Sequence, residues 1–88
     1  MPTSIDTEAQ AINVAAIVEQ IKPLLAGRDP SVQGAVLCEL LSLWLAGHSP
    51  MIRKAMFAMH FKAVQEMIPI SEKELFGDHG HPDRRKRQ

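Results

Sequence analysis

The sequence is poor in aromatic residues and in cysteine, and it carries no excess charge of either sign. Its 88 residues include no tyrosine, one tryptophan and one cysteine, and the formal net charge is zero. A single cysteine excludes an internal disulfide framework and suits a reducing compartment, so we expect a cytoplasmic protein. Because aromatic residues are scarce, aliphatic side chains and methionine must supply most of the packing.

Long apolar runs are also missing. The longest uncharged stretch, Leu40 to Ile52, contains Gly47 and Pro50 and is too short and too interrupted to span a bilayer. The first ten residues are polar and acidic, unlike a secretory signal, and no period-two alternation predicts a strand. With 45% hydrophobic and 23% charged residues, the composition is that of one small folded domain.

Apolar periodicity predicts an all-α protein with main helices at about 6–26, 30–46 and 50–68. Together they would form a small helical bundle that is completed by oligomerisation. The first helix places five apolar residues on one stripe, namely Val14, Ile17, Val18, Ile21 and Leu25. Gly27 suits the position after its end. Pro23 either kinks this helix or opens a short final turn, because proline removes a backbone hydrogen bond.

Capping residues predict where the other helices begin and end. Asp29-Pro30 and Ser49-Pro50 each match a helix start, with the proline at a position where a missing N–H costs nothing. The short link from Gly47 predicts that the second and third helices form an αα-hairpin. Pro69 should end the third helix, and the capping-box pattern from Ser71 to Glu74 predicts a short helical turn at 71–76.

Charge is distributed unevenly along the chain. Residues 1–49 carry a net charge of −3, and residues 50–88 carry a net charge of +3. Half of the basic residues in the second segment lie in the run Arg84, Arg85, Lys86 and Arg87. Gly, Pro, His and Asp precede that run. We therefore expect a helical domain at 1–76 and a disordered basic tail at 77–88.

The predicted second and third helices have more apolar surface than three helices can cover. Four of the five methionines lie in the third helix, and methionine recurs on surfaces that accommodate varied partners. These features predict a non-enzymatic helical module that forms a homodimer and binds a protein partner, without a cofactor. The expected interface residues are Leu37, Leu40, Trp44, Met56, Met59, His60 and Met67.

Two single residues have a functional and a structural interpretation each. His60 lies between apolar rows of the third helix, where it would either gate an interface by titrating or form a hydrogen bond to a neighbouring helix. The structural interpretation is favoured. Cys38 lies among leucines with no cation nearby, so we expect it to fill the core and not to act as a nucleophile.

The C-terminal segment offers two weaker alternatives. His79 and His81 lie among aspartates and could bind a metal weakly, but the glycine and proline around them give no fixed geometry. The run Arg84 to Arg87 would make the chain a small nucleic-acid-associated factor, although four basic residues without interleaved aromatics form a weak footprint. A solubilising tail is the favoured interpretation.

Overall fold

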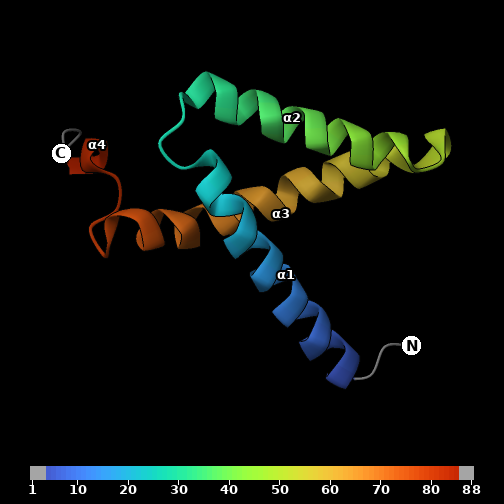
Figure 1. The fold of residues 1–88 in the computed structure, drawn as a ribbon, viewed down its shortest axis with the longest axis horizontal. Coiled ribbons are helices and arrows are strands. Elements are labelled where there is room, and N and C mark those ends of the chain that lie inside the picture. The colour runs from blue at the N-terminus through green and yellow to red at the C-terminus, as the bar shows by residue number, and fades with distance from the viewer. Residues whose placement is uncertain (1–3, 86–88) are drawn as a thin grey trace. The chain divides into compact units, whose positions relative to one another are not determined.

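The protein is all-α in the computed structural model, which describes the backbone of residues 4–85 and the side chains of residues 7–84. Its helices are α1 (Ser4–Leu25), α2 (Pro30–Ala46), α3 (Pro50–Phe76) and the short α4 (Pro82–Arg85) (Figure 1). Residues 4–85 contain no strand, so the predicted all-α class with three main helices is confirmed, and the short C-terminal helix lies at 82–85. None of the described helices combines the length and apolarity that crossing a membrane requires.

The chain divides into two compact units, of which the first ends at Leu40 and the second begins at Leu41. Among the side chains of residues 7–84, none is buried. Each unit contains one long helix packed with only part of α2, and two such elements cannot enclose a side chain on all sides. The described apolar side chains of both units are therefore half-buried at most, and the majority are exposed.

The first unit joins α1 to the beginning of α2. Gly27 has a φ of 75°, the left-handed conformation that ends many helices, as the sequence predicts. The carbonyls at the end of α1 accept hydrogen bonds from the following segment: Arg28 Nε donates to Leu24 O at 2.8 Å, and Gln33 Nε2 donates to Leu25 O at 2.7 Å. These bonds satisfy carbonyls that have no partner within the helix.

Asp29 caps the start of α2, as its position before Pro30 predicts. Its carboxylate accepts hydrogen bonds from the Ser31 hydroxyl at 2.6 Å and the Ser31 backbone N–H at 2.9 Å. The bond from the Ser31 hydroxyl, followed by that from the backbone, lowers the pKa of Asp29 from its ordinary value of 3.8.

Pro23, for which the sequence left a kink or a short final turn open, lies inside α1, which continues to Leu25.

The second unit contains the end of α2, all of α3, and α4. Ser49 caps α3 through a bond of 3.4 Å from Met51 N–H, with Pro50 in the first turn, as predicted. Arg53 then reaches back to the end of α2, donating to Ala46 O at 2.8 Å and to His48 O at 2.9 Å. Together with the short link, these bonds turn the end of α2 against the start of α3 in the expected hairpin.

The third helix is longer than the sequence predicts. We expected it to end at Ile68 before Pro69, but α3 runs without interruption to Phe76 and contains Pro69. Proline removes only its own N–H bond, and the residues that follow it, such as Glu72, Lys73 and Leu75, have good helix propensity. The expected separate turn at 71–76 is therefore the last part of α3. Its capping box does not form, because Ser71 lies inside the helix.

Candidate functional site

A small pocket lies between the end of α2 and the middle of α3. It has a volume of about 240 Å³ and is lined by Trp44, Met56, Met59, His60 and Ala63. Four of these five side chains belong to the predicted interface, and the structure brings them together within the second unit. Because Met56, Met59, His60 and Ala63 follow the spacing of consecutive turns on one helix face, α3 forms one wall and Trp44 faces them from α2.

Trp44 contacts two imidazole rings. The centre of its ring is 5.0 Å from that of His60, tilted by 41°, and 5.2 Å from that of His48 at 69°, an edge-to-face arrangement. Nδ1 of His48 also lies 2.7 Å from the Trp44 carbonyl oxygen, which can only accept, so this nitrogen donates. The indole is thus fixed between a histidine on the link and a histidine on α3.

Trp44 nevertheless remains 42% exposed in the chain. Met56 is half-buried, and the other predicted interface residues are exposed: Leu37, Leu40, Met59, His60 and Met67. His60 contacts the ring of Trp44 and is exposed, whereas its helical register between two apolar rows suggests a half-buried side chain. Cys38, expected as core filler, is exposed as well, because no second layer covers its helix face.

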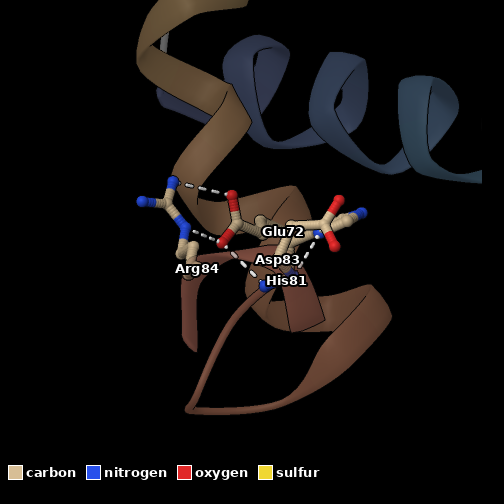
Figure 2. A network of polar contacts seen from close by, with 4 residues as sticks. All are labelled: Glu72, His81, Asp83 and Arg84. Carbon is tan, nitrogen blue, oxygen red and sulfur yellow. Dashed lines mark hydrogen bonds and ion pairs between the residues drawn. The ribbon is translucent and has the colours of Figure 1, made fainter. Parts of the chain in front are cut away.

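A second cluster gathers around Glu72 near the end of α3 (Figure 2). The carboxylate of Glu72 accepts hydrogen bonds from Arg84 Nε, from Arg84 Nη2 at 2.9 Å, and from the backbone N–H of His81 at 3.0 Å. We call Glu72, His81 and Arg84 the Glu72 clasp. The bonds from Arg84, followed by that from His81, lower the pKa of Glu72 from 4.5 to about 2. The hydrogen bond to Glu72 and its negative charge in turn raise the pKa of Arg84.

Backbone geometry permits this clasp. Gly80 has a φ of 73°, and a Cβ atom at this position would collide with the Glu72 carboxylate and press on Arg84. The ring of His81 packs edge-on against Phe76, with ring centres 4.9 Å apart. Its Nδ1 accepts from the backbone N–H of Asp83 at 3.0 Å. The segment after α3 is thus tied back to that helix by polar and aromatic contacts.

The clasp includes part of the segment that we expected to be a disordered tail. Residues 82–85 form α4, and Arg84 is held by Glu72, which is only 17% exposed. Of the remaining basic run, Arg85 is described by its backbone alone, and Lys86 and Arg87 lie outside the described residues. His79 lies in the turn before Gly80, and in residues 4–85 no group of three or more His, Cys, Asp or Glu side chains is placed to hold a metal ion.

Sequence reasoning missed the polar side chains that join consecutive segments. Gln33 and Arg53 bond to carbonyls eight and seven residues earlier, and Glu72 pairs with a residue twelve positions later. No motif of neighbouring residues predicts such pairs. The nearest signal is that Gln33 and Arg53 are each the fourth residue of a helix that follows a short link. No family model, curated protein or solved structure matches this chain.

Proposed function

We propose that this chain is a non-enzymatic helical module that self-associates as a homodimer and binds a protein partner in the cytoplasm. The observation that supports the proposal is the lack of any buried side chain among residues 7–84, in a chain that is 45% hydrophobic. Large apolar residues are exposed along α1, α2 and α3. Monomeric soluble proteins seldom expose apolar surface on this scale unless it is an interaction site.

The free-energy balance of folding explains why the lack of buried side chains matters. Ordering each residue costs about 1–2 kcal/mol of backbone entropy, and burial of apolar surface is the main term that offsets it. A domain of this size ordinarily buries roughly 60–65% of the surface that its unfolded chain exposes. With no buried side chain among residues 7–84, a single chain has only a small part of that contribution, and a second copy covering the apolar faces would supply more.

The pocket residues are suited to the centre of such an interface. Trp44 is a large, partly fixed aromatic side chain, a type enriched among the residues that dominate binding energy. Met59 is 72% exposed and can adapt its shape to a partner. Leu37 and Leu40 in the first unit add further exposed apolar area.

Sedimentation equilibrium over a range of micromolar concentrations tests the proposal. The wild-type chain should be a dimer with twice the 9.8 kDa mass of one chain. Met59→Lys should weaken the dimer about tenfold or more, because a charge placed in an apolar interface loses its hydration. Gln65→Lys adds the same charge to a polar position of α3 and should leave the association unchanged. A folded, cooperatively unfolding 9.8 kDa species throughout would refute self-association.

The alternative, a nucleic-acid-associated factor, rests on the basic run from Arg84 to Arg87. The Glu72 clasp weighs against it, because the Arg84 guanidinium is already paired with a carboxylate. Salt-sensitive binding of DNA or RNA that disappears when residues 84–87 are deleted would favour this alternative. Absence of such binding at low salt would remove it.

A further inference from the structure

The pocket lined by Trp44, Met56, Met59 and His60 holds an unusual set of donor atoms for a surface made of apolar residues. Met56, Met59 and His60 occupy positions i, i+3 and i+4 of α3, so their Cβ atoms are neighbours on one helix face. Two thioether side chains and one imidazole side chain therefore line a space of about 240 Å³. The indole of Trp44 lines the same space, and its ring centre is 5.0 Å from that of His60.

The chemistry of this donor set selects one class of ligand. Thioether sulfur is a soft donor that suits Cu(I), whereas Mg²⁺ and Ca²⁺ require oxygen ligands. The pocket lining contains neither a carboxylate nor a thiolate, the anionic ligands on which most protein zinc sites depend. An uncharged set of two sulfurs and one nitrogen therefore favours a soft monovalent cation over the common divalent ions.

The position of each side chain is compatible with binding such an ion. Met59 is 72% exposed and has three rotatable bonds, so its sulfur can swing toward an ion that enters from solvent. Met56 is half-buried and lines the same pocket. The electron-rich face of a tryptophan attracts cations within about 6 Å of its ring centre, and Trp44 lines this pocket.

We propose that this pocket binds one Cu(I) ion per chain, with Met56, Met59 and His60 as ligands and the Trp44 indole beside the ion. Ag(I), a soft cation of the same charge and preferred donors, binds in the same place. All four residues belong to one chain and to its second unit. The site therefore needs no residue from a second copy. The proposed homodimer would cover the same surface, so Cu(I) binding and association are measured on the same samples, and either proposal can fail without the other.

Anaerobic titration with Cu(I), in competition with a coloured Cu(I) chelator, tests the site. Every protein in the experiment carries Cys38→Ala, because the exposed thiol of Cys38 would itself bind Cu(I). Binding should saturate at one ion per chain and quench the fluorescence of Trp44, the only tryptophan. Air-stable Ag(I) should give the same stoichiometry and quenching, and Zn²⁺ should not.

Isosteric variants identify the ligands. Met56→Leu and Met59→Leu keep the apolar volume but remove one sulfur each, and each should weaken Cu(I) binding about tenfold or more, since even supporting residues around a metal contribute 10–100-fold. Met67→Leu makes the same change on α3 outside the pocket and should bind as the parent does. Circular dichroism confirms that the variants are folded, and sedimentation reports association separately. Binding that is unsaturable, that leaves Trp44 fluorescence unchanged, or that survives both pocket substitutions would overturn the proposal.

Discussion

At the scale of single residues, Glu72 has the most strongly perturbed environment among the described residues. Three N–H groups converge on its carboxylate, two from Arg84 and one from the His81 backbone. A carboxylate that accepts several charge-assisted hydrogen bonds is held in its ionised form. The clasp is therefore an electrostatic connection between α3 and the segment that follows it, with a defined response to pH.

That response can be measured as the titration midpoint of the Glu72 carboxyl group. The folded pKa of about 2 lies below the ordinary value of 4.5, so the clasp stabilises the folded chain fully above about pH 4.5. The contribution is lost as the pH falls from there toward 2. Carbon-13 NMR of the Glu72 carboxyl should show a midpoint near 2 in the intact protein. Arg84→Gln should move it up toward 4.5, and a wild-type midpoint already near 4.5 would show that the clasp does not form.

Gly80 provides a second, steric test of the same cluster. Gly77 and Gly80 both have positive φ, at 84° and 73°, so alanine is strained at either position. Only at Gly80 would the added Cβ collide with the Glu72 carboxylate, since the space around Gly77 is open. Gly80→Ala should therefore raise the NMR midpoint of Glu72 toward its ordinary value, whereas Gly77→Ala should not. Equal effects of the two substitutions would contradict the close approach of Gly80 to Glu72.

At the scale of elements, α3 is a 27-residue helix that contains a proline. Pro69 cannot donate to the carbonyl four residues earlier, and its ring crowds that carbonyl. Pro50, by contrast, lies in the first turn of the same helix, where the N–H has no intrahelical partner. The two prolines form a matched pair, because their chemistry is the same and only their place in the helix differs.

We expect Pro69→Ala to stabilise the protein by up to about 3 kcal/mol, the difference in helix propensity between the two residues. Pro50→Ala should change stability little or lower it slightly, because proline is favoured at a helix start. Urea unfolding followed by circular dichroism measures both effects. If Pro69→Ala destabilises the protein instead, Pro69 makes contacts or fixes a local geometry that alanine does not reproduce.

At the scale of the whole molecule, stability should depend on protein concentration. Trp44 is the expected centre of the apolar surface, yet it is 42% exposed in the single chain. The proposed homodimer would bury it fully, and Trp44→Ala should then cost roughly 3–5 kcal/mol.

The thermal midpoint should accordingly rise with protein concentration, and the emission of Trp44 should shift to shorter wavelength over the same range. Reaction of the exposed Cys38 with a thiol reagent provides an independent probe, and it should slow if association covers that face of α2. A midpoint that stays constant over a hundredfold change in concentration would contradict the homodimer, since association necessarily makes stability concentration-dependent.

The sequence by itself determined the helical class and most helix ends. Asp29, Ser49 and Gly27 act on backbone groups within a few residues, so their effects can be inferred without knowing the rest of the fold. It also identified Trp44, Met56, Met59 and His60 as residues on apolar helix faces, because a helix repeats its faces with a fixed period.

Only the tertiary structure decided that these four residues share one pocket and that Glu72 pairs with Arg84. Such contacts depend on how the chain reverses between elements, which no local pattern specifies. The continuation of α3 through Pro69 has a related cause. A proline lowers helix stability by a limited amount, and the favourable bonds and contacts on both sides of it decide whether the helix ends.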